Sequence, residues 1–291
     1  MADLVFGLDL PAAVSPGYDP VASARQAEDL GFDFMSTSDH PCGTAPSYET
    51  WTMLSWVAAQ TSRIRVATRV LGVPYRAPAM VAKMAETLDR FSGGRLILGL
   101  GGGYSDDEFR AFGLGVPTPG EKVDGLSEAI QIARGLWSQP RFSFAGRRYG
   151  VREADVEPKP EHRIPIWVGT YGNRALALTG ALADGWIPSY GFAPPERIPA
   201  MRERILAAAA EAGRPADAIT GIYNVGIRVD DRAEPEPSTV VGGPEEVAER
   251  LAGLVGLGFA GFNFQPIGAD RDLQAQRLAQ EVIPLVRAAV A

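Results

Sequence analysis

The chain alternates short apolar runs with amphipathic stretches along its whole length. A short apolar run between turn residues indicates a buried strand, whereas apolar positions that recur every three or four residues indicate a helix with one face on a core. The apolar runs predict strands at residues 4–10, 34–38, 65–71, 95–100, 166–168, 186–188, 220–229 and 259–265.

The segments between these strands carry helix signals. Asp19 is placed to cap a helix that has Pro20 at its first position and Gly31 after its end, which predicts a helix over 20–30. Two further stretches have apolar residues at helical spacing and are predicted to lie with that face on a sheet. These stripes are Leu126, Ile130, Ala133 and Trp137 in the first stretch and Val247, Leu251, Leu254 and Val255 in the second.

Strands separated by helices pair in parallel, because each helix has to cover the sheet and return the chain to the same edge. The eight predicted units indicate a closed (β/α)8 TIM barrel with a short insertion, formed by residues 1–291 as a single domain. Such a barrel needs about 250 residues. We expect the surplus at 113–160, as loops and a small hairpin that form an insertion or lid, and an acidic, proline-rich loop at 230–238.

Charge and cysteine content narrow the class of function. Lys and Arg total 28 and Asp and Glu total 35, which gives a net charge of −7 and weighs against nucleic acid or an anionic membrane as a partner. The N-terminus carries Asp3 and Asp9 and no basic residue before Arg25, so no secretory signal is expected. The single cysteine, Cys42, fits a reducing compartment. We therefore expect a cytoplasmic protein.

Residues 251–269 carry no charge and are long enough to cross a bilayer. Five glycines, together with Asn263, Gln265 and Pro266, would weaken such a helix. The sequence therefore favours a helix end that runs into a buried strand.

Polar residues and glycines gather where the predicted strands end. In a parallel barrel these ends open on one mouth, which is where such barrels carry their function. The positions are Asp9, Ser38, Asp39, His40, Arg69, residues 101–105, residues 169–173, Ser189, Tyr190, Asn263 and Gln265.

Asp39 and His40 are the most informative of these positions. His40 is one of two histidines, and an acid beside a histidine can orient its ring or bind a hydroxyl group. The alternative is a plain turn before Pro41. Asp9 is equally a site residue or a loop cap, and His162, in a polar loop, is expected at the surface.

The glycine run that ends at Gly103 lets the backbone pass close to a planar ligand. It is not a Rossmann fingerprint, because Tyr104 stands where the last glycine would be. The acidic residues 106–108 that follow are predicted to be the first turn of a helix rather than a metal site. A second glycine loop, at 169–172, opens a helix whose free backbone N–H groups suit a phosphate, and Arg174 adds positive charge.

Several other chemistries lack their residues. Two histidines and one cysteine do not make a usual zinc site, and the sequence contains no phosphate loop of the GKS or GKT type and no nucleophile elbow. We therefore expect neither a metal centre nor a hydrolase.

Four stretches together carry a family resemblance. Residues 27–40 (AEDLGFDFMSTSDH), 61–113, 164–186 (IPIWVGTYGNRALALTGALADGW) and 242–266 resemble the bacterial luciferase-like family, in particular its deazaflavin branch. The resemblance implies a (β/α)8 barrel that binds a flavin or coenzyme F420 at the strand ends, with an inserted segment partly covering the mouth. It also implies a homo-oligomer, which we expect to be a dimer.

The resemblance assigns roles to particular residues. It implies that Asp39 and His40 contact the deazaflavin ring region, and that a non-prolyl cis peptide bond at Arg69–Val70 bulges against the ring. Two glycine segments would approach the rest of the cofactor. These are Gly102 and Gly103, and the phosphate-binding loop of Gly172, Asn173 and Arg174, with Gly169 at the start of that loop.

The sequence departs from the family pattern at two positions. Some deazaflavin relatives have a catalytic carboxylate directly after the glycine run, where this chain has Tyr104, so the proton donor is left open between Tyr104, His40 and water. Arg69 stands where relatives tend to have a small or apolar residue. It can pair with Asp9 or Asp39, or bind an anionic group, and the ion pair is favoured because an unpaired buried guanidinium is costly.

The resemblance therefore implies an oxidoreductase that moves a hydride between F420 and a small organic substrate, with Asp39, His40 and Tyr104 as candidate catalytic residues. Two alternatives stay open, an FMN-dependent monooxygenase that uses dioxygen and a protein that binds the cofactor without turnover. The sequence does not identify the substrate. Trp51, Trp56 and Tyr75 are expected either near the mouth or in the core. If they lie near the mouth, they suit a hydrophobic substrate.

Overall fold

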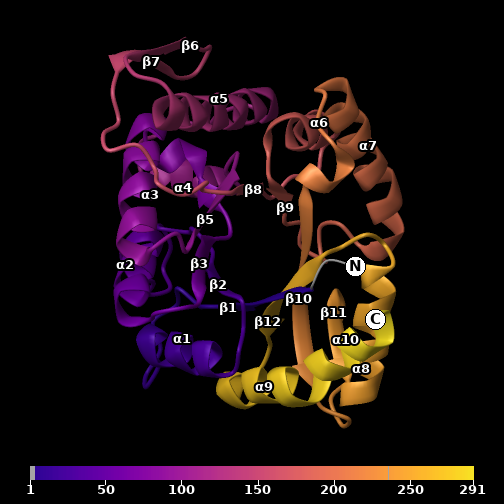
Figure 1. Cartoon of the computed structure of the whole chain (residues 1–291). Coiled ribbons are helices and arrows are strands. Elements are labelled where there is room, and N and C mark those ends of the chain that lie inside the picture. Colours follow the sequence, from indigo (N-terminus) through magenta and orange to yellow (C-terminus); the bar gives the residue numbers. More distant parts are fainter. Residues whose placement is uncertain (1–3, 235) are drawn as a thin grey trace.

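Parallel strands close into a barrel around a central axis (Figure 1). The computed structural model of the chain describes residues 4–234 and 236–291, so Asp3 and Pro235, which belong to segments discussed above, lie outside it. Strand β12 pairs with β1 and β10 pairs with β9, which closes the ring of eight strands in the described residues. In order around the barrel the strands are β1 (Val5–Asp9), β2 (Phe34–Thr37), β3 (Arg65–Thr68), β5 (Leu96–Gly101), β8 (Ile166–Val168), β9 (Gly185–Trp186), β10 (Thr220–Val229) and β12 (Gly261–Pro266). The predicted TIM barrel is confirmed.

The third predicted strand, 65–71, is divided in two. Strand β3 ends at Thr68, the Arg69–Val70 peptide bond is cis as the family resemblance implied, and the chain continues in β4 (Leu71–Gly72), which pairs with β5. The Thr68 hydroxyl donates to the Gly99 carbonyl at 2.7 Å and accepts from the Gly99 N–H at 2.8 Å. The Thr68 hydroxyl thus bonds to β5 at the point where the third strand is divided.

A parallel strand that the sequence did not predict, β11 (Thr239–Gly242), lies beside the second half of β10. It follows the acidic loop, and its apolar part is limited to Val240 and Val241, which is too short to stand out. Because β10 is long, it contacts β9 at its start, β12 along its middle and β11 at its end.

Helices surround the barrel on its outer side (Figure 1). Asp19 caps the first one as predicted, accepting from the Val21 N–H at 2.8 Å. The two predicted apolar stripes lie on α5 and α8. The helices are α1 (Pro20–Asp29), α2 (Thr50–Gln60), α3 (Pro78–Ser92), α4 (Asp106–Ala111), α5 (Pro119–Ser138), α6 (Asn173–Leu182), α7 (Ile198–Glu211), α8 (Pro244–Val255), α9 (Arg271–Arg277) and α10 (Ile283–Val290), with short 3-10 turns at Val73–Tyr75, Pro195–Arg197 and Ala216–Ala218 and a π turn at Leu278–Val282.

The uncharged stretch 251–269 is the end of α8 followed by β12, as predicted. Within the residues that the structure describes, no helix combines the length and the apolar character that crossing a membrane would require.

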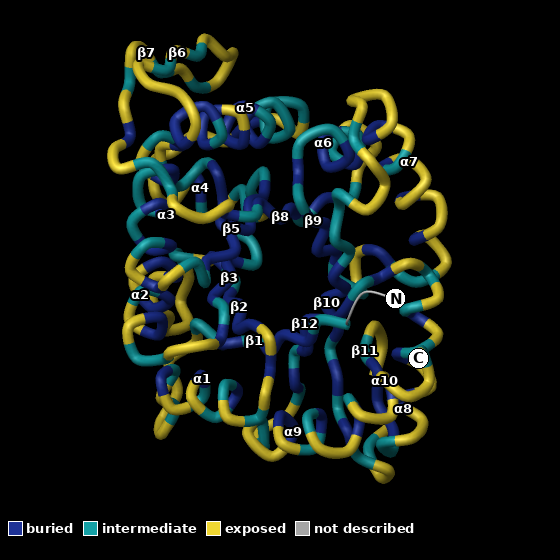
Figure 2. The backbone as a smooth tube through the Cα atoms, in the orientation of Figure 1, coloured by how far each residue is buried: buried dark blue, intermediate teal, exposed yellow. Residues whose placement is uncertain are grey.

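Two apolar regions hold the barrel together. One fills the barrel itself and the other lies between the strands and the helices, so the strands form a buried ring in Figure 2. The inner region consists of Phe34, Ala67, Ile97, Trp167, Ile187 and Ile222. Side chains alternate along a strand, so Ser36 and Ser38 follow Phe34 on the inner face of β2. A layer of polar side chains therefore lies between the inner apolar region and the mouth of the barrel.

The small hairpin predicted within 113–160 is formed by β6 (Phe142–Ala145) and β7 (Gly150–Ala154). It lies on the outer face of α5 (Figure 1). The buried carboxylate of Glu128 in α5 accepts from the backbone N–H groups of Arg147, Arg148 and Tyr149 at 2.6, 2.9 and 2.7 Å. One α5 side chain thus fastens the hairpin turn.

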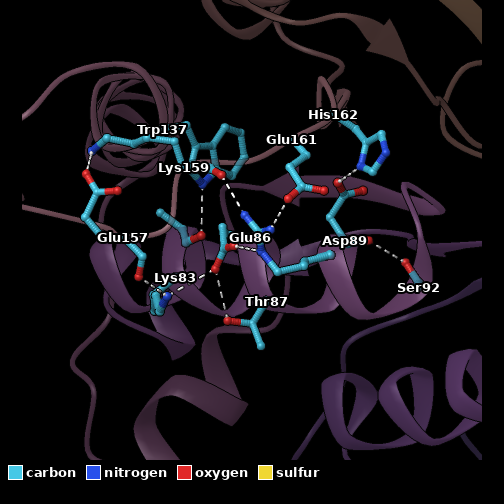
Figure 3. A network of polar contacts seen from close by, with 12 residues as sticks. Lys83, Glu86, Thr87, Asp89, Ser92, Trp137, Glu157, Lys159, Glu161 and His162 are labelled. Carbon is cyan, nitrogen blue, oxygen red and sulfur yellow. Dashed lines mark hydrogen bonds and ion pairs between the residues drawn. The ribbon is translucent and has the colours of Figure 1, made fainter.

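The segment that returns from the hairpin to β8 is fastened to α3 by the polar network in Figure 3. Arg90 donates to buried Glu86 at 2.7 Å and to the Lys159 carbonyl at 2.8 Å. His162, with 47% of its side chain exposed, lies 3.3 Å from Asp89. Its predicted place at the surface is confirmed, and the network joins α3, the end of α5 and the return segment rather than lying at the mouth.

Candidate functional site

The C-terminal ends of the barrel strands surround a cavity of about 360 Å³. This volume is typical of small-molecule sites. Most of the residues predicted from strand ends line it. The lining residues are Ser38, Asp39, His40, Arg69, Val70, Gly72, Tyr75, Gly101, Gly102, Gly103, Tyr104, Gly169, Tyr171, Ile187, Ser189 and Phe192.

Two other cavities of similar volume lie outside the barrel wall. One of about 330 Å³ is enclosed mainly by the loop before α1 and by α9, and one of about 380 Å³ lies between α2 and α3. The mouth cavity differs from both because polar groups from several strands converge on it, which is the arrangement expected of a barrel active site.

The glycines around the cavity exist for different reasons. A Cβ atom on Gly99 would lie 1.8 Å from the Thr68 carbonyl oxygen, one on Gly101 would lie 2.5 Å from a Val70 methyl, and Gly103 has φ of +96°. The fold itself requires glycine at these three positions. A Cβ on Gly169 would meet nothing closer than 3.6 Å, so packing does not require glycine there. The missing side chain of Gly169 leaves space at the floor of the cavity beside Val70.

Arg69 is held at the floor of the cavity by an ion pair. Its Nη2 lies 2.6 Å from Asp9 Oδ1, and its Nε donates to the Ser36 hydroxyl at 3.1 Å. With the Gln265 amide turned so that its oxygen faces the guanidinium, that oxygen lies 2.9 Å from Nη1. The predicted ion pair is confirmed, and its partner is Asp9 rather than Asp39. Asp9 also accepts from Arg271 at 2.8 Å, so one carboxylate serves two guanidinium groups.

A chain of buried hydrogen bonds crosses the barrel from Arg69 to the opposite wall. Ser36 donates to Asn263 Oδ1 at 2.8 Å, Asn263 Nδ2 donates to Asn224 Oδ1 at 2.7 Å, and Asn224 Nδ2 donates to the Ser189 hydroxyl at 2.8 Å. The sequence analysis did not single out Asn224. The signal was an asparagine in the middle of an otherwise apolar strand, where a buried amide needs partners.

The Asp39 carboxylate is fully buried and faces away from His40. Its Oδ2 accepts from Arg76 Nη1 at 2.8 Å and from the Gly72 N–H at 2.9 Å, and its Oδ1 accepts from Arg76 Nη2 at 3.1 Å. Burial alone would lower the pKa of Arg76, but hydrogen bonds to Asp39 and Glu49 raise it above its usual value. Asp39 therefore anchors the segment that follows the third strand.

The acid that contacts His40 is Glu108, which the sequence analysis treated as part of a helix turn. That turn exists, since Ser105 caps α4 and accepts from the Glu108 N–H. The Glu108 side chain, however, reaches back to the mouth, where Oε1 lies 2.9 Å from His40 Nδ1 and Oε2 accepts from the Tyr75 hydroxyl at 2.5 Å. Half of the His40 side chain is exposed, against 12% for Glu108. Burial, together with the bond to Glu108, raises the pKa of Tyr75 well above its usual value.

Aromatic rings form the rim of the mouth. Tyr104 is 74% exposed, and its ring lies 6.3 Å from His40 and 5.8 Å from Phe192, which in turn lies 5.5 Å from Tyr171. Phe192 lies in the loop after β9 and was not predicted. Trp51 and Trp56 do not line this cavity in the described structure, whereas Tyr75 does.

The predicted phosphate loop adjoins the cavity. Gly172 precedes α6, and no side chain of the described residues caps that helix, so its first backbone N–H groups stay open to a ligand. A Cβ on Gly172 would meet nothing within 4 Å. Arg174 is exposed and lies 2.6 Å from Asp124 of α5. Tyr171, next to this loop, lines the cavity itself.

Comparison with known proteins identifies what the chain resembles. The family model for luciferase-like monooxygenases matches residues 10–236. The F420-dependent glucose-6-phosphate dehydrogenase of Kineococcus radiotolerans is 30% identical over 91% of each chain. Two solved structures share the fold. An F420-dependent secondary alcohol dehydrogenase in complex with an F420-acetone adduct has a TM-score of 0.88 at 19% identity over 98% of this chain and 99% of its own. The oxygenating constituent of 3,6-diketocamphane monooxygenase from Pseudomonas putida, in complex with FMN, has a TM-score of 0.77 at 18% identity over 97% and 98%.

Proposed function

The chain belongs to the luciferase-like monooxygenase family, and we propose that it is an oxidoreductase that uses coenzyme F420 to move a hydride to or from a small organic molecule. The name of the Kineococcus relative, matched along nearly the whole of both chains, supports the choice of cofactor. The observation that carries the proposal is the open floor of the mouth cavity, where Gly169 has no packing reason to be glycine.

The residues present fit a flat ring with a phosphorylated side arm. Val70, Gly102, Gly103 and Gly169 would lie against the ring, because glycines leave room for a planar surface beside the Val70 bulge. The phosphate would be held at the start of α6 by residues 172–174, where backbone N–H groups and Arg174 favour an anion. When bound there, F420 supplies the hydride acceptor or donor.

The protein's own residues have to move a proton and keep charges in place. Oxidation of an alcohol removes a hydride from carbon and a proton from oxygen, and reduction of a carbonyl reverses both transfers. His40 is the titratable side chain at the mouth suited to the proton transfer, since half of it is exposed. We assign Asp39 a positioning role through Arg76 and Gly72, and Tyr104 a place in the rim that excludes water.

Titration of the purified protein with F420 and with FMN, followed by cofactor fluorescence, tests the proposal. We expect saturable F420 binding, and we expect Gly169→Val to weaken it at least tenfold, which is about 1.4 kcal/mol, because the new side chain fills the floor. Gly253→Ala is the control, since a Cβ there meets nothing within 4 Å and lies far from the mouth on α8. Tight FMN binding without F420 binding would reject the proposal.

The FMN-dependent monooxygenase is the second candidate, because the same barrel holds FMN in the diketocamphane enzyme. A reduced flavin reacts with dioxygen, so this candidate predicts oxygen consumption by the FMN-loaded, reduced protein. Our proposal predicts none with reduced F420 and predicts reoxidation by an organic acceptor instead. If the protein binds the reduced cofactor but no candidate acceptor reoxidises it, a cofactor-binding protein without turnover is favoured.

A further inference from the structure

A neutral imidazole carries one proton, and the group that faces one ring nitrogen decides which nitrogen carries it. His40 Nδ1 faces Glu108 Oε1 at 2.9 Å, on the side of the ring turned to α4. If the proton of the neutral ring lies on Nδ1, between these two atoms, the other nitrogen, Nε2, is unprotonated and can accept.

Tyr75 fixes the hydrogen-bonding role of Glu108. The Tyr75 hydroxyl donates to Oε2 at 2.5 Å and keeps its proton, since burial and this bond both raise the pKa of Tyr75. A carboxylate has no proton to donate, so Oε1 accepts from His40 just as Oε2 accepts from Tyr75. Consequently Nδ1 carries the proton of the neutral ring, and Nε2 is left as an acceptor.

The charged neighbours of His40 have other partners. Asp39 is bound to Arg76 and to the Gly72 N–H, and Arg76 is shared between Asp39 and Glu49. On α4, Asp106 lies 2.6 Å from Lys122 and Asp107 lies 2.5 Å from Arg110. Tyr104 meets the histidine with its ring. Glu108 is thus the carboxylate that acts on the imidazole.

We propose that Glu108, locked by Tyr75, is a positioning residue that keeps His40 in its Nδ1–H form, so that Nε2 takes the proton of the substrate. This inference rests on the proposed function, which supplies the substrate whose proton Nε2 takes. When an alcohol is oxidised, the C–H bond breaks with both electrons leaving as hydride to F420, the O–H bond breaks with its proton passing to Nε2, and a C=O bond forms. In the reverse direction the imidazolium returns that proton to oxygen.

The substitution Glu108→Gln tests the proposal because the Tyr75 hydroxyl has no acceptor other than residue 108 among the described residues, so its hydrogen is satisfied in one orientation of the new amide. The hydroxyl donates to the amide oxygen, which turns the NH₂ group towards His40 Nδ1. Nδ1 then has to accept, and the proton moves to Nε2. We expect kcat to fall by about a hundredfold or more, as for loss of a general base, with KM for the substrate and Kd for F420 unchanged.

The double variant Tyr75→Phe/Glu108→Gln separates positioning from simple damage. Without the hydroxyl the amide is free to turn its oxygen to Nδ1, so we expect at least tenfold recovery of kcat relative to Glu108→Gln. A double variant as slow as the single one would overturn the proposal.

The second readout is the ¹⁵N spectrum of the two histidine rings in the protein without cofactor, at a pH where the imidazoles are neutral. His162→Gln assigns the signals. We expect a protonated Nδ1 for His40, moving to Nε2 in Glu108→Gln and back in the double variant, while Asp89→Asn, beside His162, leaves the His40 signals unchanged. A protonated Nε2 in the unsubstituted protein overturns the inference. Absence of F420 binding with the expected spectra defeats the proposed function instead.

Discussion

The guanidinium of Arg69 and the carboxylate of Asp9 meet at 2.6 Å beneath the mouth, and neither side chain exposes more than 11% of its surface. They come from the third and the first strand of the barrel, with β2 between them. Because Asp9 also binds Arg271, the cluster contains two positive groups and one negative group. Of these three groups only Arg69 lines the mouth cavity, whereas Asp9 and Arg271 line the cavity of about 330 Å³ beside α9.

This cluster predicts unequal effects of removing its members. Asp9→Ala leaves two arginines without their carboxylate, and we expect it to lower the free energy of unfolding by about 3 to 5 kcal/mol. Arg69→Met leaves Asp9 paired with Arg271, so the loss should be smaller, about 1 to 2 kcal/mol. Urea denaturation of both variants checks the order, and equal losses would contradict it.

Glu28 predicts an acid-dependent part of the stability. Burial alone would raise the pKa of Glu28, but N–H groups of Ile64, Arg63 and Ser62 at 2.8, 2.6 and 3.0 Å lower it from 4.5 to about 2. A carboxylate with a lowered pKa stabilises the fold above its unfolded value and loses that effect as the pH falls. The difference in unfolding free energy between the unsubstituted protein and Glu28→Gln should shrink from pH 4.5 to pH 2. Parallel urea midpoints over that range would refute the assignment.

Glu128 predicts local loosening of the hairpin. Glu128→Ala removes the acceptor of three backbone N–H groups, and we expect a loss of about 1.5 to 3 kcal/mol together with faster hydrogen exchange at 142–154. The hairpin lies on the outer face of α5, so F420 affinity should stay within about twofold. A larger change in affinity would mean that this part of 113–160 acts on the mouth, as the lid hypothesis requires.

The outer face of α2 and α3 predicts self-association. Trp56, Met80 and Phe91 expose 61%, 57% and 83% of their surface on these helices, and Phe91 lines the cavity of about 380 Å³ between them. Exposed apolar patches mark interaction sites. We expect light scattering to report a dimer, and Phe91→Lys to shift the mass towards the monomer. Leu285→Lys on α10 is the control, and a monomeric unsubstituted protein would end this expectation.

The barrel was predictable because each strand carries its own apolar run and each helix its own signals. The division of the third strand was predictable only through the family resemblance, since nothing in the residues 65–71 marks it locally. Strand β11 was missed because only two of its residues, Val240 and Val241, are apolar.

The partner of His40 was not predictable from its neighbours. Asp39 and His40 are adjacent in sequence, yet the Asp39 carboxylate binds Arg76 and the Gly72 N–H instead of the imidazole. The acid that reaches the imidazole is 68 residues away on α4. Residues 106–108 together are typical of a helix start, so nothing in the sequence distinguished Glu108, whose side chain reaches His40, from Asp106 and Asp107.

The hydrogen-bond chain across the barrel has one further consequence. A guanidinium can only give protons, so every bond after Arg69 runs in the same sense, through Ser36, the two asparagines and on to the oxygen of Ser189. The Ser189 hydroxyl accepts from Asn224 with one of its two lone pairs and donates to no group among the described residues, so its hydrogen is available on the wall of the cavity. A molecule that brings a lone pair to that wall can accept from Ser189, so an arginine on one side of the barrel orients a free hydrogen-bond donor on the other.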